Sequence, residues 1–144
     1  MKKYLVILSL SLLIPFFLSA QTTDPLVTSC AMSAGPNTTY LKDFRVQLGK
    51  GNPQTELRYK QVFPLSKNMK YKFTLCNAEN SGGELIMRLK DNTGKLVLAS
   101  FDQESGKIYP SIEFTCMKTG TYQLSFDFRD FQQGLGVGVI SLVK

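Results

Sequence analysis

Apolar and polar residues alternate along most of the chain after residue 40, with the period of two that places side chains on opposite faces of a β-strand. The clearest alternation runs over residues 112–128, where large apolar residues recur at every second position on both sides of a short connection at 117–120. We predict that this stretch is a β-hairpin and that Gly120 takes the positive φ of its tight connection. The hairpin would present one apolar face for the other strands to cover.

Shorter alternating segments precede this stretch, separated by clusters rich in glycine, proline, asparagine and aspartate. No window of helical length carries the apolar stripe of an amphipathic helix. We therefore predict an all-β fold, an antiparallel, jelly-roll-like β-sandwich of about eight strands. The predicted core positions of the earlier strands are Phe44, Val46 and Leu48; Leu57, Tyr59 and Phe63; Tyr71, Phe73 and Leu75; and Leu85, Met87 and Leu89.

Residues 1–20 have the three parts of a signal peptide. Lys2 and Lys3 form a basic start, an apolar run follows, and Ala20 is a small residue before a cleavage site at Gln21. A membrane anchor is the alternative, but the apolar run is short for a spanning helix and Pro15 interrupts it. We predict export with cleavage, a polar extended lead-in over residues 21–40, and one β-sandwich domain over residues 41–144.

The distribution of charge argues against nucleic acid as a ligand. The chain has 17 Lys+Arg and 11 Asp+Glu, a formal net charge of +6, which falls to +4 when Lys2 and Lys3 leave with the signal peptide. The basic residues are spread singly along alternating strands and form no basic run with interleaved aromatic residues. We predict no nucleic-acid binding and, after signal removal, no membrane span.

The chain contains no histidine. This removes Ser-His-Asp and Cys-His catalysis and the most common acid–base group at neutral pH. Five carboxylates, most of them in predicted turns, could form a glycosidase-type pair or bind calcium, but local hydrogen bonding explains turn aspartates more simply. We predict that the protein is not an enzyme and has no cofactor, and we assign no metal ligands. The carboxylates considered are Asp91, Asp102, Glu104, Asp127 and Asp130.

Three segments carry a recurring pattern. They are 70–75 (KYKFTL), 85–96, which contains an apolar strand and then D-x-x-G-x-L, and 112–122, which ends in G-T-Y. Together they resemble the bacterial pre-peptidase C-terminal domain, a jelly-roll module of secreted proteins. The resemblance implies a non-catalytic sandwich that accompanies an envelope or secreted protein. The signal peptide and the short terminal strand are also similar to those of small exported proteins of Bacteroidota-like bacteria.

Three cysteines in an exported chain allow one disulfide and leave one thiol. The resemblance implies that the strands carrying Cys76 and Cys116 are antiparallel neighbours, with the two cysteines at opposite edges. On that basis we predict a disulfide between Cys30 and Cys116, which would join the lead-in to the sandwich. Three reduced, buried thiols are the alternative.

Glycines alternate along the last strand. Gly134, Gly136 and Gly138 lie on one face and leave bare backbone there. We predict that a large side chain such as Phe126 or Tyr122 packs over this face inside the sandwich. The alternative is a partner strand that docks on it, and the β-rich end of the chain is also similar to the C-terminal sorting domains of type IX secretion cargo.

These observations favour a protein that works by binding. We predict a non-catalytic protein-interaction or structural accessory module of the bacterial cell envelope, located in the periplasm, at the outer membrane or outside the cell, with an envelope or secreted protein as its partner. The alternative is a small carbohydrate-binding module with an exposed aromatic platform, although the absence of tryptophan weakens it. The predicted platform residues are Tyr40, Tyr59, Tyr109 and Phe131.

Overall fold

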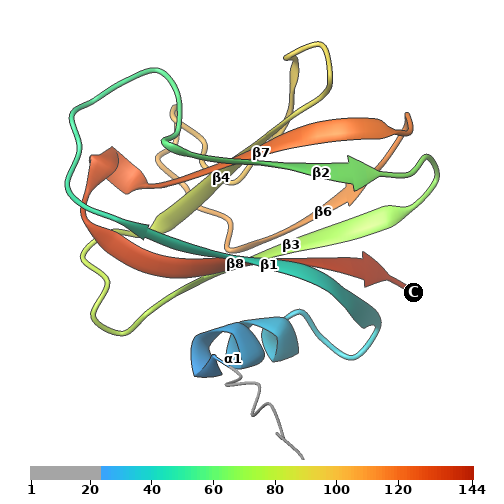
Figure 1. Ribbon diagram of the computed structural model, residues 1–144, viewed down its shortest axis with the longest axis horizontal. Coiled ribbons are helices and arrows are strands. Elements are labelled where there is room, and N and C mark those ends of the chain that lie inside the picture. The colour runs from blue at the N-terminus through green and yellow to red at the C-terminus, as the bar shows by residue number, and fades with distance from the viewer. Residues whose placement is uncertain (1–23) are drawn as a thin grey trace, which may run out of the picture.

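Eight antiparallel strands form two facing four-stranded sheets, and one short helix lies against the outside (Figure 1). The computed structural model describes residues 24–144, so the predicted signal peptide lies outside the described residues. The predicted antiparallel β-sandwich is confirmed. The elements are α1 Pro25–Ser33, β1 Thr38–Leu48, β2 Tyr59–Leu65, β3 Lys70–Asn77, β4 Leu85–Lys90, β5 Leu96–Ala99, β6 Ser111–Thr115, β7 Gly120–Phe128, η1 Arg129–Phe131 and β8 Gly134–Val143.

The strand order is that of a jelly roll. One sheet has the order β1-β8-β3-β6 and the other the order β2-β7-β4-β5. Four of the strand pairings are those of one long hairpin folded at the β4–β5 turn. They are β1 with β8, β2 with β7, β3 with β6 and β4 with β5. Rolling this hairpin up adds the pairs β3 with β8 and β4 with β7. The result is two facing sheets in which every neighbouring pair is antiparallel.

The predicted hairpin over residues 112–128 is wrong, because its two strands belong to different sheets. β6 pairs with β3, whereas β7 pairs with β2 and β4. The connection crosses from one sheet to the other, and Phe114 and Tyr122 meet edge to face, with ring centroids 6.1 Å apart. Gly120 pairs with Leu65 and is not among the glycines with positive φ, so its predicted conformation is also wrong.

The core lies between the sheets and contains the alternating positions that the sequence predicted, with one exception. Leu57 precedes β2 and does not belong to this core, so its prediction as a core position of a strand is wrong. Val46, Phe73, Leu89, Leu124 and Phe126 are all at most 2% exposed. Because alternate residues point inward, their neighbours on each strand face outward, toward solvent or toward loops that fold over the sheet. The two outer faces are therefore where loops and α1 can create sites.

The glycine face of β8 is covered from inside the sandwich. A Cβ on Gly138 would lie 2.5 Å from the Cε1 atom of Phe126, and a Cβ on Gly134 would overlap the ring of Phe128. The prediction that a ring packs here is thus confirmed for Phe126, with Phe128 as the second ring. The alternative partner strand at Gly134, Gly136 and Gly138 is wrong, because β8 lies between β1 and β3 and has both edges paired.

Residues 25–33 form a helix instead of an extended lead-in. Asp24 caps the first turn by accepting a hydrogen bond from the Leu26 N–H (3.0 Å), and Pro25 occupies the first helical position, where its missing N–H has no cost. The helix packs Leu26 and Val27 against Val137 and Val139 of β8. The nine residues of this helix are too few to show the long apolar stripe by which an amphipathic helix is predicted from sequence.

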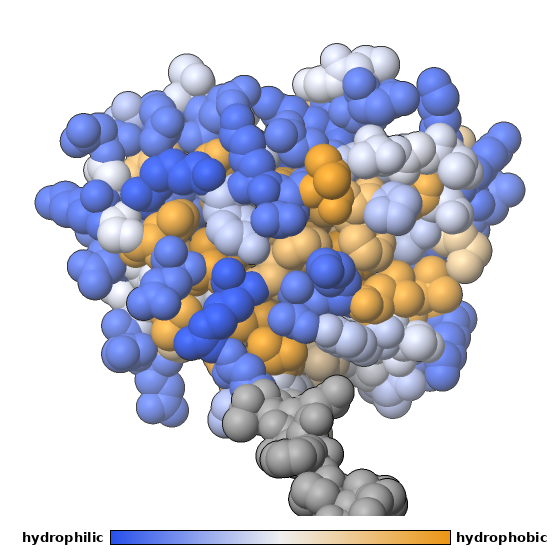
Figure 2. Space-filling model, in the orientation of Figure 1, coloured by the Kyte–Doolittle hydropathy of each residue, from blue (hydrophilic) through white to orange (hydrophobic). Residues whose placement is uncertain are grey.

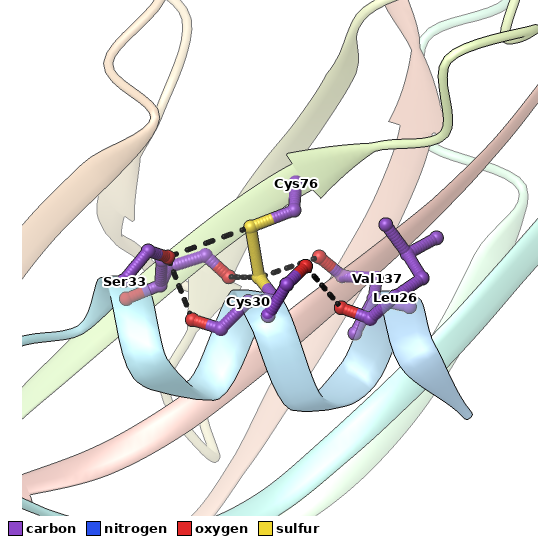
Figure 3. Close-up of a disulfide and its surroundings, with 7 residues drawn as sticks. Leu26, Cys30, Ser33, Cys76 and Val137 are labelled. Atoms are coloured by element: carbon purple, nitrogen blue, oxygen red, sulfur yellow. Dashed lines mark hydrogen bonds between the residues drawn. A yellow bond between two sulfur atoms is a disulfide. The ribbon is translucent and has the colours of Figure 1, made fainter. Parts of the chain in front are cut away.

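The disulfide joins Cys30 to Cys76, not to Cys116 (Figure 3). Cys30 lies in α1, and Cys76 lies on the outer face of β3, with their Cα atoms 5.8 Å apart. The strands of Cys76 and Cys116 are antiparallel neighbours, β3 carrying the first and β6 leading into the second. Cys116, however, belongs to the inner core and is a free, buried thiol, so the sheet separates it from Cys30.

Candidate functional site

A hollow of about 580 Å³ lies on the outer side of the β2-β7-β4-β5 sheet, where loops from several parts of the chain meet. Leu85, Met87 and Leu89 of β4 point into the core, so Ile86 and Arg88 point outward into this hollow. We call it the loop hollow. Its lining residues are Pro53, Gln54, Thr55, Leu57, Ile86, Arg88, Phe101, Gln103, Phe128, Asp130 and Phe131.

One wall of the loop hollow is the β1–β2 loop, and a buried ion pair holds that loop in place. The Asp127 carboxylate is fully buried and accepts hydrogen bonds from the Arg58 Nε (3.0 Å), Nη2 (2.9 Å) and backbone N–H (2.9 Å). The Arg58 Nη1 also donates to the Gly49 carbonyl at 2.7 Å. This single guanidinium therefore joins the two ends of the loop to β7, with the bidentate geometry that makes such pairs strong.

Two further hydrogen bonds connect this loop to the rest of the site. The Gly51 N–H donates to the Phe131 carbonyl at 2.8 Å, and the Arg88 Nη1 donates to the Thr55 carbonyl at 3.0 Å. The wall is thus tied to the β7–β8 turn and to the sheet beneath it. A site with its groups held before a ligand arrives loses less entropy on binding.

Two aromatic residues, Phe101 and Phe131, line the loop hollow, and an arginine lies over the ring of each. The guanidinium carbon of Arg129 is 5.3 Å from the ring centroid of Phe101, and that of Arg58 is 5.8 Å from the ring centroid of Phe131. Cation–π contacts of this kind favour a fixed ring orientation. Because each arginine occupies one face of its ring, the remaining face and edge can line the hollow.

The backbone at the β7–β8 turn is in a rarely occupied conformation. Asp130 and Phe131 both have positive φ, 57° and 54°, in the left-handed region that non-glycine residues avoid. Such residues cost about 1–3 kcal/mol each and cluster at functional sites, where the surrounding structure enforces them. Here the turn directs both residues to the loop hollow.

The structure does not bring the four predicted platform residues together. Phe131 lines the loop hollow, whereas Tyr40 lines a separate hollow of about 590 Å³ between α1 and β1. A hydrogen bond to Asp43 raises the pKa of Tyr40 to about 12. Tyr59 is half-buried and contacts Phe126 edge to face, with centroids 6.0 Å apart. Tyr109 is exposed beneath the Lys107 ammonium, which lies 4.8 Å from its ring centroid.

The turn aspartates behave as the sequence predicted. Asp91 accepts hydrogen bonds from the Thr93 hydroxyl (2.6 Å) and from the N–H groups of Thr93 and Lys95. These bonds lower the pKa of the Asp91 carboxyl, and the bond from the Thr93 hydroxyl contributes most. Asp102 accepts from Ser105 (2.9 Å) and the Glu104 N–H (2.9 Å), which lower its pKa likewise. These carboxylates are occupied in shaping their turns.

Most residues of the loop hollow could not be predicted from the sequence pattern. Alternation alone gives Arg88 a solvent-facing position on its strand and gives Phe101 no role beyond the end of the next alternating segment. Asp127 occupies an outward position of β7, so its burial under the β1–β2 loop could not be deduced from alternation. The one available signal is the density of aromatic and charged residues at 127–131. From it, Phe131 was predicted as a platform residue, and Asp127 and Asp130 were considered only as carboxylates.

Residues 24–144 contain no group of three or more histidine, cysteine, aspartate or glutamate side chains placed to hold a metal ion. In that same region, no helix is both long and apolar enough to cross a membrane. No family model matches the chain, and no curated protein sequence matches it.

Proposed function

We propose that this protein is a non-catalytic binding module exported to the bacterial cell envelope, and that the loop hollow is a carbohydrate-binding site. The observation that carries the proposal is the composition of the hollow. Two fixed aromatic rings, Phe101 and Phe131, lie beside the amides of Gln54 and Gln103 and the charged groups of Arg88 and Asp130.

This composition matches the chemistry of a sugar ring. A sugar has apolar C–H faces, which pack on aromatic rings, and hydroxyl groups at its edge, which both donate and accept hydrogen bonds. Amide, carboxylate and guanidinium groups supply complementary donors and acceptors. A hollow with apolar walls and a few convergent polar groups is the usual form of a small-molecule site.

Export is supported by two independent observations. Residues 1–20 have the pattern of a signal peptide. The Cys30–Cys76 disulfide is of the kind that persists in oxidising compartments such as the periplasm or the exterior.

The proposal is tested with residues 21–144 on an array of neutral and acidic bacterial and plant glycans. We expect Phe101→Ala to weaken retention of the bound glycan by about two- to tenfold, because one aromatic stacking contact is worth roughly 0.5–1.5 kcal/mol. Tyr109→Ala is the matched control, since it removes an exposed ring outside the loop hollow. Equal retention by the two variants, with both folded by thermal unfolding, would exclude the loop hollow as the site.

A protein-interaction role is the second candidate, and a different surface favours it. β1 and β2 are edge strands on the same side of the sandwich, and Figure 2 shows apolar residues gathered in the middle of this side. Val62 of β2 is 65% exposed, and Leu41 of β1 is also exposed. An uncovered strand edge with apolar neighbours can pair with a strand of another protein.

This second candidate is tested by crosslinking the tagged protein in its own cells and identifying what co-purifies. Introducing lysine at Leu41 and Val62 should abolish recovery of an envelope partner, because charged edge strands resist pairing. Phe101→Ala should leave recovery unchanged. Recovery that depends on Phe101 and not on the edge strands would contradict this role.

A further inference from the structure

Arg88 is the charged group of the loop hollow that has no opposite charge beside it. None of the ion pairs within residues 24–144 includes Arg88. Its neighbours are paired. Arg58 is neutralised by the buried Asp127, and Lys90, two residues further along β4, pairs with Glu56 at 3.6 Å.

The guanidinium of Arg88 is held in place while most of its donors stay free. Nη1 donates to the Thr55 carbonyl at 3.0 Å, which fixes the side chain against the β1–β2 loop. That contact uses one of five N–H groups, and no other acceptor for Arg88 lies within hydrogen-bond distance in residues 24–144. A planar guanidinium with a free edge is suited to a carboxylate, which accepts two parallel hydrogen bonds from it.

The other charges around the loop hollow leave this role to Arg88. Asp130 lines the hollow, but its carboxylate is 78% exposed and its nearest cation is Arg129, with Nε 3.9 Å away. Arg129 lies over Phe101, but it pairs with Asp130 and is not among the residues that line the hollow. The net formal charge of residues 21–144, +4 without Lys2 and Lys3, also favours the approach of a polyanion.

We propose that the ligand of the loop hollow is an acidic sugar, whose ring carboxylate pairs with Arg88 while the sugar face packs on Phe101 or Phe131. This inference rests on the proposed carbohydrate-binding function and adds the charge of the ligand to it. Uronic acid residues of bacterial or plant polysaccharides have this chemistry.

The experiment compares acidic oligosaccharides with their methyl esters, because esterification removes the charge and keeps the ring. Oligogalacturonate, oligoguluronate and hyaluronan oligosaccharides, each with its methyl ester, are titrated against residues 21–144 by calorimetry. We expect at least one acid to bind about tenfold or more tightly than its ester, since a charge-assisted bidentate pair is lost in the ester.

Two variants connect this preference to Arg88. Arg88→Gln should reduce the preference for acid over ester to less than about twofold, whereas Lys90→Gln, on the same strand and outside the lining, should keep it. Esters that bind as tightly as the acids, or a preference that Arg88→Gln retains, would overturn the inference.

The outcomes also separate this inference from the proposed function. Neutral glycans or esters that bind in a Phe101-dependent manner, with no preference for acids, would leave a carbohydrate-binding module without the acidic specificity. Failure of every acidic and neutral glycan to bind would overturn both the function and the inference.

Discussion

Gly138 and Phe126 are complementary at the scale of single residues, because the ring occupies the space that a side chain would need. The Cβ of an alanine at position 138 would lie 2.5 Å from the Cε1 atom of Phe126. We expect Gly138→Ala to reduce the free energy of unfolding by about 1–3 kcal/mol, as overpacking in a dense core does. Urea denaturation of the purified protein measures the loss.

Gly120→Ala is the matched control for this substitution. Like Gly138, Gly120 is a strand residue, the first of β7. Unlike at Gly138, no atom lies within 4 Å of a Cβ built there. Alanine there should leave stability unchanged or raise it slightly, because the unfolded chain loses freedom. Similar losses in both variants would show that strand glycine in general, and not the Phe126 ring, causes the effect.

Asp127 is a buried carboxylate whose partner, Arg58, keeps 20% of its side chain exposed. Asp127→Asn would leave the arginine charge without its counterion and remove the anchor of the β1–β2 loop. We expect a loss of about 3 kcal/mol in the free energy of unfolding, the low end for breaking a buried pair, because Arg58 retains some solvent. Denaturation curves measure it.

The exposed pair between Lys70 and Glu113 provides the comparison. Glu113→Gln should give no measurable change, since water screens both charges. If Asp127→Asn were equally neutral, the ion pair would not be what holds the β1–β2 loop.

At the scale of elements, α1 depends on its attachment to the sheet. A nine-residue helix is too short to be stable alone in water. The Cys30–Cys76 disulfide closes a sequence separation of 46 residues, for which the chain-entropy relation gives roughly 4 kcal/mol. We expect reduction to lower the free energy of unfolding by about 2–4 kcal/mol and to weaken the amide-exchange protection of residues 25–33.

Cysteine variants check the assignment of this bond. Replacing both Cys30 and Cys76 by serine should make stability insensitive to reductant, whereas Cys116→Ala should keep the sensitivity of the unmodified protein. A Cys116 variant that no longer responds to reductant would instead place Cys116 in the disulfide. Peptide mapping without reduction gives the same information directly.

At the scale of the whole molecule, the rolled hairpin pairs distant parts of the chain. β1 and β8 pair Thr38 with Val143, so the outermost strands of the sequence must meet before their sheet is complete. Loop closure of this kind precedes the contacts that stabilise it and slows folding. We expect oxidised residues 21–144 to refold in milliseconds to seconds after urea dilution. The fluorescence of the five tyrosines in this range reports the refolding, because the chain has no tryptophan. Refolding within microseconds would contradict the dependence on distant strand pairs.

The sequence by itself determined where strands occur and which of their faces is apolar. Tyr71, Phe73 and Leu75 are buried as their alternation predicted, and the loop at residues 91–94 does connect paired strands, with Gly94 at a φ of 85°. These properties are local, since the pleat of a strand and the conformational freedom of glycine act within a few residues.

Only the tertiary structure decided which strands share a sheet and which side chains meet across loops. Alternation predicts a shared face for Phe114 and for Tyr122 within their own strands, but it cannot tell a hairpin from a crossing between sheets. The pairing of Cys30 with Cys76 depends on the packing of α1 on the outer face of one sheet. The burial of Asp127 and the assembly of the loop hollow depend on the loops that cover the outer face of the other sheet. Each depends on contacts between residues far apart in the chain, and the energy of such contacts has no signature in the local pattern.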